Sequence, residues 1–324
     1  MHEWRPRLMA LGILVLAAAT GSLTVNRDSP LSIETPITSY SPPRTPWGDP
    51  DLQGAYSNSD ERGIPMTRPA DLKRFRIERF PPAELARLNR QRSLQLDPAA
   101  NVWEQVYEPV QLRNSRPWLV SDPPDGQIPR PITARTQELA KSPVASTTGS
   151  WKPWESLDLQ TRCVTRGLPG SMMPDILGNA YEIVQAPGVV AITYEAIHEA
   201  RIVYLDGRPP VGRDLRTYLG DARGRFEGDT LVVETTNFTN RTPFHLSSES
   251  LRLVERFTPI AAATLQWSVT LDDSKTWPTP WTFALNLTRT DGRPLEYACH
   301  EGNYSLRNIL AITADTTGKW HSQR

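Results

Sequence analysis

The chain has 324 residues, of which 38% are hydrophobic, and it balances 36 basic against 36 acidic side chains. Without net charge it lacks the long-range field that draws a protein to nucleic acid or to an anionic membrane surface, so we expect no nucleic-acid partner. The apolar content is sufficient for one substantial core, and the 30 prolines indicate long stretches of extended chain around it.

Residues 1–22 have the pattern of a secretory signal peptide. Arg5 and Arg7 precede an apolar run, Leu8 to Ala19, and this run of 12 residues is shorter than the ~20 that a transmembrane helix needs. We therefore expect cleavage, no stable membrane anchor afterwards, and a periplasmic or secreted mature protein. An uncleaved anchor is the alternative.

Residues 23–150 are predicted to form a proline-rich arm that wraps the main domain. Within it we expect a short strand at Leu52–Asn58 and a helix from Pro81 to about Arg92, where proline and an acidic residue occupy the first turn. A second short helix is expected at Thr133–Lys141. The small, polar run Ser142–Ser150 marks the boundary of the arm.

Residues 151–315 are predicted to form an antiparallel β domain, followed by a tail, 316–324. Turn signals stand at Pro187-Gly188, Gly220–Gly224, Glu227–Asp229 and Asp291-Gly292, and a bulge or corner is expected at Glu195–Glu199. The expected strands are Tyr181–Ala186, Val189–Tyr194, Ile202–Leu205, Thr230–Thr236, Arg252–Thr258, Thr264–Leu271, Trp281–Thr288 and Pro294–Cys299. Ser305 is expected to cap a closing helix, Leu306–Ile312.

Many short strands at close spacing favour a mainly β fold over a parallel α/β sheet. We expect about nine or ten strands in an antiparallel barrel or a sandwich, with a few short helices.

Cys163 and Cys299 are the only cysteines. In an oxidising compartment they most simply form one disulfide, and two buried free thiols are the alternative. A lone pair without CxxC spacing does not indicate a zinc site.

The high-specificity catalytic motifs are absent. The chain has no glycine-rich phosphate loop, no GxSxG elbow and no HExxH, which excludes the common nucleotide, serine-hydrolase and zincin sites from the leading hypotheses, and we expect no cofactor.

Acid–base chemistry is the leading hypothesis for the polar residues that remain. Glu195 and His198 stand in TYEAIHEAR, Glu255 in LVERF, and His300 and Glu301 in YACHEGNY. Histidine titrates near neutrality and an adjacent carboxylate fixes its tautomer, so these five residues are candidate catalytic residues if the fold gathers them in one pocket. The alternatives are ordinary structural hydrogen bonds and salt bridges, or a divalent-metal site built from the same donors.

A second set of residues is suited to holding a small molecule. Trp277, Trp281, Tyr218 and Tyr304 could form aromatic walls, although core packing is the commoner fate of such side chains. Arg223 and Asn303 could stabilise negative charge on a substrate. The interleaved acidic residues around Arg223 favour surface salt bridges instead.

Several motifs resemble a large family of exported, mostly uncharacterised bacterial proteins. They include TPWGDPDLQGAYSN, LDGRPP, GDARGRFEGDTLVVETTNF and EYACHEGNYSL, in the same order, and the similarity extends from about Pro46 to Leu310. The resemblance implies export and a lipocalin-like β fold, and it assigns no reaction. This chain departs from the family pattern at Pro210, where relatives often have histidine, and at Tyr218 and Phe226, where they often have tryptophan.

Two functions of different classes follow. The first is an extracytoplasmic hydrolase, lyase or isomerase that acts on a small apolar, aromatic or glycosidic metabolite in a barrel pocket. The second is a lipocalin-like carrier without catalysis. The enzyme requires His198 and His300 to line one pocket beside a carboxylate, and the carrier requires a pocket without them.

Overall fold

The computed structural model describes residues 40–96, 112–140, 157–175 and 178–315, which all belong to one compact unit, Thr38–Arg324. The predicted signal peptide, the predicted boundary at Ser142–Ser150 and the tail lie outside the described residues.

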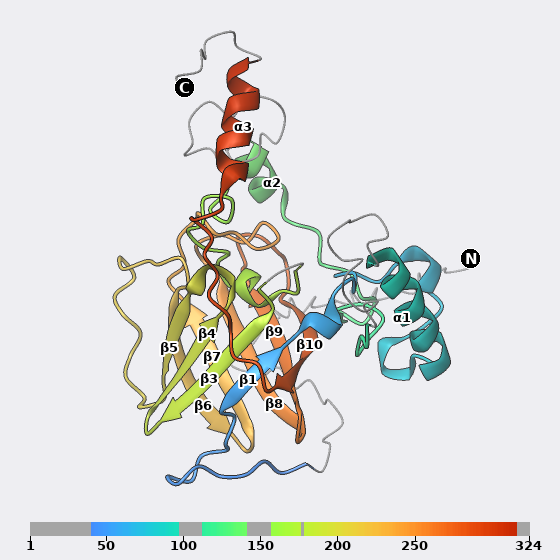
Figure 1. Cartoon of the computed structure of the whole chain (residues 1–324), viewed down its shortest axis with the longest axis vertical. Helices are drawn as coiled ribbons and strands as arrows, with labels where there is room; N and C mark the ends of the chain where they lie inside the picture. The colour runs from blue at the N-terminus through green and yellow to red at the C-terminus, as the bar shows by residue number, and fades with distance from the viewer. Residues whose placement is uncertain (1–39, 97–111, 141–156, 176–177, 316–324) are drawn as a thin grey trace, which may run out of the picture. The chain divides into compact units, whose positions relative to one another are not determined.

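A single sheet of ten strands dominates the fold. Its order is β1-β3-β4-β5-β6-β7-β8-β9-β10-β2, and β1 also pairs with β10, so all strands except β2 form a closed barrel (Figure 1). The strands are β1 Gly54–Ser57, β2 Val120–Asp122, β3 Ala180–Ala186, β4 Val189–Tyr194, β5 Ala200–Tyr204, β6 Asp221–Glu227, β7 Thr230–Thr236, β8 Arg252–Ala261, β9 Thr264–Asp272 and β10 Trp281–Thr290. The mainly β barrel expected from the sequence is confirmed.

One seam of the barrel is parallel, which corrects the purely antiparallel arrangement that we expected. β5 and β6 run in the same direction because the long connection 205–220 returns the chain before β6 begins, and they pair only at Val203↔Ala222 and Tyr204↔Arg223. The remaining strand pairs in the sheet are antiparallel. Within the described ranges, this short seam leaves β5 residues 200–202 without a strand neighbour on that side.

Alternating burial explains most strands that the sequence predicted. β8 alternates buried and partly exposed side chains along almost its whole length, and β7 combines β-branched residues with a buried centre. Gly228 adopts a left-handed backbone, φ +61°, in the tight turn between β6 and β7, as its position in that predicted turn requires.

Two segments were predicted wrongly because tertiary pairing overrides local signals. The run Gly220–Gly224 was expected to be a turn, but most of it lies in β6, where seven residues pair with β7. Pro294–Cys299 was expected to be a strand, but it is irregular. Both edges of β10, the preceding strand, are already occupied, one by β9 and the other by β1 and β2, so the chain that follows has no edge there to join.

The segment predicted as a covering arm contributes to the sheet. β1 closes the barrel and β2 pairs with the start of β10, so the β structure draws on residues well before 151. The short strand β2 was not expected, because a strand of three residues between prolines leaves little periodicity to detect.

Three α-helices accompany the sheet in the described residues: α1 Pro82–Leu96, α2 Thr133–Ala140 and α3 Tyr304–Asp315. The cap of α3 is Asn303, whose Oδ1 accepts a hydrogen bond from the Leu306 N–H at 3.2 Å, and not the predicted Ser305. Short 3₁₀ turns are η1 Ser59–Glu61, η2 Ala70–Leu72, η3 Ile77–Arg79, η7 Gly170–Met172 and η8 Ala196–His198. No described helix has the length and apolarity needed to cross a bilayer.

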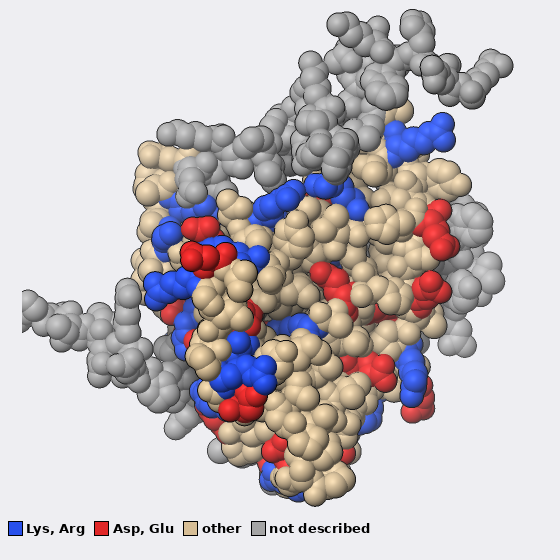
Figure 2. All heavy atoms as spheres, turned by 90° about the vertical axis from the view of Figure 1, so that its left-hand side faces the viewer, with Lys and Arg blue, Asp and Glu red and all other residues tan. Residues whose placement is uncertain are grey.

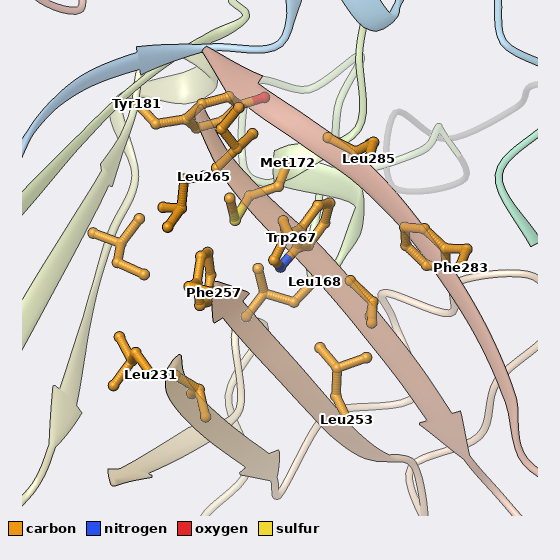
Figure 3. Packing of buried hydrophobic residues seen from close by; sticks show 14 of the residues in the cluster. Leu168, Met172, Tyr181, Leu231, Leu253, Phe257, Leu265, Trp267, Phe283 and Leu285 are labelled. Atoms are coloured by element: carbon orange, nitrogen blue, oxygen red, sulfur yellow. The ribbon is translucent and has the colours of Figure 1, made fainter. Parts of the chain in front are cut away.

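The barrel interior is a packed apolar core. Large side chains such as Phe257, Trp267 and Phe283 come from its strands, and Leu168 and Met172 enter from the segment around η7 (Figure 3). Leu168 and Met172 are almost fully buried, so the η7 segment acts as an internal plug. Because side chains fill the interior, we expect a small molecule to bind at an end or at a seam of the barrel.

Candidate functional site

The disulfide between Cys163 and Cys299 is confirmed. It joins the chain just before the plug to the segment after β10, across 136 residues of sequence. Asn303 strengthens the same junction, because its Nδ2 donates to the Thr161 carbonyl at 2.8 Å. The role of Asn303 here is structural.

The two candidate histidines are neighbours of this junction but are not enclosed. The backbone N–H of Tyr297 donates to Nδ1 of His198 at 3.0 Å, which brings His198 close to the segment that carries His300. Both imidazoles are exposed, and neither lines the two cavities described below. The condition that the catalytic hypothesis placed on His198 and His300 is not met by these cavities.

Other predicted site residues are dispersed. Glu195 is half-buried at the corner after β4, whereas Glu301 and Tyr304 are exposed. Trp277 and Trp281 are fully buried and pack edge to face at 5.5 Å, so they belong to the core and not to an aromatic wall.

Arg223 supports a loop. Its guanidinium forms an ion pair with Asp221 at 2.6 Å and donates to the carbonyl oxygens of Arg208 and Pro209. It therefore holds the connection 205–220 against β6, as the salt-bridge alternative predicted.

A cleft opens on the side of the barrel where β5 and β6 separate. Its volume is about 350 Å³, within the range of small-molecule sites. One wall is β5 from its preceding residue Glu199 to Ile202, and the other runs from Thr217 to Ala222 and includes the half-buried ring of Tyr218. We call this the β5–β6 cleft. Figure 2 faces the side of the barrel that carries β5 and shows basic and acidic side chains interspersed over it.

Arg201, a residue of the cleft lining, forms a buried ion pair whose charged groups lie in the barrel interior. Arg201 lines the cleft but is only 5% exposed, and its two terminal nitrogens donate to the two carboxylate oxygens of Glu255, which is fully buried. Trp267 Nε1 donates to the same carboxylate at 3.0 Å. Burial alone would lower the pKa of Arg201, but the attraction of Glu255 outweighs it and raises that pKa, so the guanidinium stays charged.

Three buried polar atoms belong to Arg201, to Tyr194 beside it and to Tyr181, which packs on Tyr194. Arg201 Nε and the hydroxyl groups of Tyr181 and Tyr194 are buried and have no hydrogen-bond partner among the described residues. Burial raises the pKa of both tyrosines, so both remain neutral donors. An unpaired buried donor costs about 1–3 kcal/mol, which makes the Nε of Arg201, the one residue of the three that lines the cleft, a candidate for contact with water or ligand.

Glu199 stands at the edge of the same cleft. Its Oε2 accepts a hydrogen bond from Ser171 of the plug at 3.1 Å. Burial raises the pKa of Glu199 above its ordinary value, and hydrogen bonds from Thr165, Ser171 and the Arg166 backbone offset part of that effect. This carboxyl group can therefore exchange a proton closer to neutrality than an exposed one.

The cleft thus combines a neutralised ion pair, a carboxyl group that resists ionisation and an aromatic ring. Among the described residues no group of three or more histidine, cysteine, aspartate or glutamate side chains could hold a metal ion. The arrangement suits hydrogen bonding to a neutral, polar molecule.

Sequence reasoning identified part of this site. Tyr218 lines the cleft, and Glu255 lies behind Arg201, but Arg201 and Glu199 were not singled out. In the run ARIVY, Ile202 is exposed and Arg201 is buried, the reverse of what hydropathy suggests. Only the pairing of β5 reveals which face of the strand is internal.

No family model matches the chain, and neither a curated protein nor a solved structure matches it.

Proposed function

We propose that this chain is an exported small-molecule-binding protein whose ligand occupies the β5–β6 cleft. Export rests on the sequence pattern of residues 1–22, and a disulfide agrees with an oxidising compartment. The observation that carries the proposal is the cleft itself, whose lining includes Arg201, a charged residue that is nearly buried, and the half-buried ring of Tyr218.

A buried ion pair is weak evidence of stabilisation, because desolvation offsets most of the attraction between the charges. Replacing such a pair by apolar residues is often neutral or stabilising. A buried pair of which one member lines a cleft is better explained by recognition, with the buried Nε of Arg201, which has no hydrogen-bond partner among the described residues, as donor to a ligand oxygen.

The chemistry of the walls defines the ligand class. The charge of Arg201 is already balanced by Glu255, and Asp221 is paired with Arg223, so a strongly anionic ligand gains little. Hydroxyl or amide groups can bond to Glu199 and Arg201 while a flat face packs on Tyr218. We infer a neutral molecule rich in hydroxyl or amide groups, such as a glycoside.

The test is calorimetric titration with a panel of small neutral glycosides and amides, together with native mass spectrometry for a compound that co-purifies. Tyr218→Ala should weaken binding about threefold to tenfold through loss of the aromatic contact. The double change Arg201→Met/Glu255→Leu should weaken it about tenfold or more, since it removes the proposed Nε donor and the carboxylate that orients it.

Leu215→Ala provides the matched control, because Leu215 is exposed in the same connection but does not line the cleft. Binding that survives both cleft changes, or a folded protein to which no probe and no co-purified compound binds, would exclude this site.

Acid–base catalysis in the same cleft is the second candidate function, and the raised pKa of Glu199 favours it. Glu199→Gln should then preserve ligand affinity and abolish turnover, measured by mass spectrometry of a periplasmic metabolite extract. Identical turnover by Glu199→Gln and wild type would exclude Glu199 as the catalytic group, and His300→Ala tests the catalytic role predicted from the sequence.

A further inference from the structure

A second cavity lies at the end of the barrel where the chain enters β1. Its volume is about 390 Å³. The segment before β1, which passes beneath the barrel in Figure 1, forms one wall, and the turn between β8 and β9 and the end of β10 form the other. We call it the barrel-end pocket. It shares no lining residue with the β5–β6 cleft.

Most of the barrel-end pocket is apolar. Pro42, Pro43, Leu52, Ala261 and Leu265 contribute to its walls. The segment that carries Pro43 is fixed in place, because the backbone N–H of Asp51 donates to the Pro43 carbonyl at 2.8 Å. The pocket therefore offers a formed surface for an apolar group of a small molecule.

Arg289 is the cation of this pocket, and its position is built into the fold. Its Nη2 donates to the Tyr56 hydroxyl at 3.0 Å, and the guanidinium lies 5.1 Å from the centre of the Tyr56 ring. A Cβ atom at Gly54 would collide with Nη1 of Arg289, so a larger residue there would move the guanidinium from its present position. Gly54 also has φ +137°, which other residues rarely adopt.

Tyr56 holds the side chain of Arg289 in this orientation. The ring is 3% exposed, and its hydroxyl donates to the Leu52 carbonyl at 2.9 Å, which leaves the oxygen free to accept from Arg289. Burial raises the pKa of Tyr56 despite the nearby guanidinium, so the hydroxyl remains protonated at neutral pH. No other side-chain hydrogen bond of Arg289 is formed within the described part of the chain, so its remaining donors can serve a ligand.

Asp51 supplies the opposite charge in the same pocket. Its Oδ1 accepts from the backbone and side-chain nitrogens of Gln53. Among the ion pairs formed by the described residues, none includes Asp51 or Arg289. One small cavity thus holds a carboxylate and a guanidinium that do not neutralise each other.

We propose that the barrel-end pocket binds an apolar α-amino acid in its zwitterionic form. The ligand carboxylate would pair with Arg289, its ammonium group would face Asp51, and its side chain would pack on the proline and leucine wall. Arginine binds carboxylates in bidentate fashion, and a ligand with both charges satisfies both residues at once. This inference is independent of the ligand of the β5–β6 cleft.

Three probes that share one apolar body separate the contributions of the charges. Phenylalanine carries both charged groups, 3-phenylpropionate carries only the carboxylate, and phenethylamine carries only the ammonium group. Calorimetric titration of the full-length protein should rank phenylalanine first, and leucine should bind as a second apolar amino acid. Raising the salt concentration should weaken binding, since Arg289 is exposed.

Variants of Arg289 and Asp51 test which charged group of the ligand each residue binds. Arg289→Gln should weaken phenylalanine binding about tenfold or more, and Arg289→Lys, which keeps the charge but loses the planar fork, should have an intermediate effect. Asp51→Asn should reduce the advantage of phenylalanine over 3-phenylpropionate. Arg225→Gln, at an arginine of β6 that does not line the pocket, is the matched control, and thermal melts establish that each variant is folded.

The proposal is overturned if folded wild-type protein binds neither phenylalanine nor leucine at millimolar concentration. Equal affinity for phenylalanine and 3-phenylpropionate would also overturn it, as would an affinity that Arg289→Gln leaves unchanged. Tyr218→Ala should not alter phenylalanine binding, so failure at one cavity is distinguishable from failure at the other.

Discussion

The β5–β6 cleft and the barrel-end pocket each contain an arginine, and the two arginines are held in opposite ways. Arg201 is 5% exposed, and Glu255 takes both of its terminal nitrogens. Arg289 is exposed and packs on a tyrosine ring, and no ion pair of the described residues includes it. The same side chain is neutralised in one cavity and available in the other.

The different environments of Arg201 and Arg289 favour ligands of different charge. A guanidinium that is already balanced offers a directional donor without net charge, whereas an unbalanced one attracts a carboxylate. The comparison therefore predicts two ligands of different charge type on one barrel. It also predicts different costs when each residue is changed.

The largest expected effect on stability follows from removing Glu255, the buried partner of Arg201. Glu255→Ala should lower the free energy of unfolding by about 3–5 kcal/mol, because it leaves Arg201 buried and uncompensated. Glu234→Ala, which breaks the exposed pair of Glu234 with Arg252, should cost no more than ~1 kcal/mol. Urea unfolding measures both, and equal costs would show that the Arg201 pair is not desolvated.

Reduction of the disulfide should have the next largest effect. Opening the Cys163–Cys299 bond releases a loop defined by a separation of 136 residues, and removal of a native disulfide typically costs about 2–5 kcal/mol. The plug that carries Ser171 should loosen, so binding in the β5–β6 cleft should weaken more than phenylalanine binding at the barrel end.

Melting temperatures with and without reductant, and the double change Cys163→Ala/Cys299→Ala, measure this effect. A protein whose melting temperature and cleft affinity do not respond to reduction would show that the plug is held by packing alone.

Arg223 offers a smaller and more local test. Arg223→Ala removes the hydrogen bonds to Arg208 and Pro209 and leaves Asp221 unpaired, so we expect a loss of about 1–2 kcal/mol in unfolding free energy. Because Asp221 lines the β5–β6 cleft, ligand affinity there should fall while phenylalanine affinity stays constant. Arg225→Ala on the same strand should cost less than ~1 kcal/mol. A larger loss at the barrel end than in the cleft would contradict this assignment.

The fold was largely predictable from the sequence because its signals are local. β4 and β7 begin and end at the predicted residues, since alternation and turn residues bound both strands. The disulfide also followed from composition, because only two cysteines were available. Register, the parallel seam and the use of β1 and β2 depend on pairing between distant segments, which no local pattern encodes.

The candidate site was predictable only in part, for the same reason. Tyr218 was identified by its type, but the roles of Arg201 and Arg289 arise from their neighbours. Arg201 stands in a strand whose inward face is set by β4, and Arg289 reaches a pocket through contact with Tyr56, 233 positions earlier in the chain. The sequence-based hypothesis instead selected His198 and His300, because histidine is the usual residue of acid–base chemistry, and both side chains are exposed.

The smallest expected effect is on how the free energy of unfolding depends on pH. It distinguishes the two cavities because Glu199 of the β5–β6 cleft and Tyr56 of the barrel-end pocket titrate in different pH ranges. Burial raises the pKa of Glu199 above its ordinary value of 4.5, so the folded state holds this proton more tightly than the unfolded state. As pH rises from about 4.5 towards the raised pKa, the unfolded state ionises first and the protein loses stability.

Glu199→Gln should remove this part of the pH dependence without altering stability well below pH 4.5, where the carboxyl is protonated in both states. Urea midpoints across the acid range measure it, and Glu61, whose pKa burial also raises, contributes equally to both curves. Tyr56→Phe is the control from the barrel-end pocket, because the ordinary pKa of 10.0 and its upward shift place Tyr56 titration in the alkaline range. Parallel curves for wild type and Glu199→Gln would mean that Glu199 is solvated in the folded protein, and acid–base chemistry in the cleft would lose its candidate.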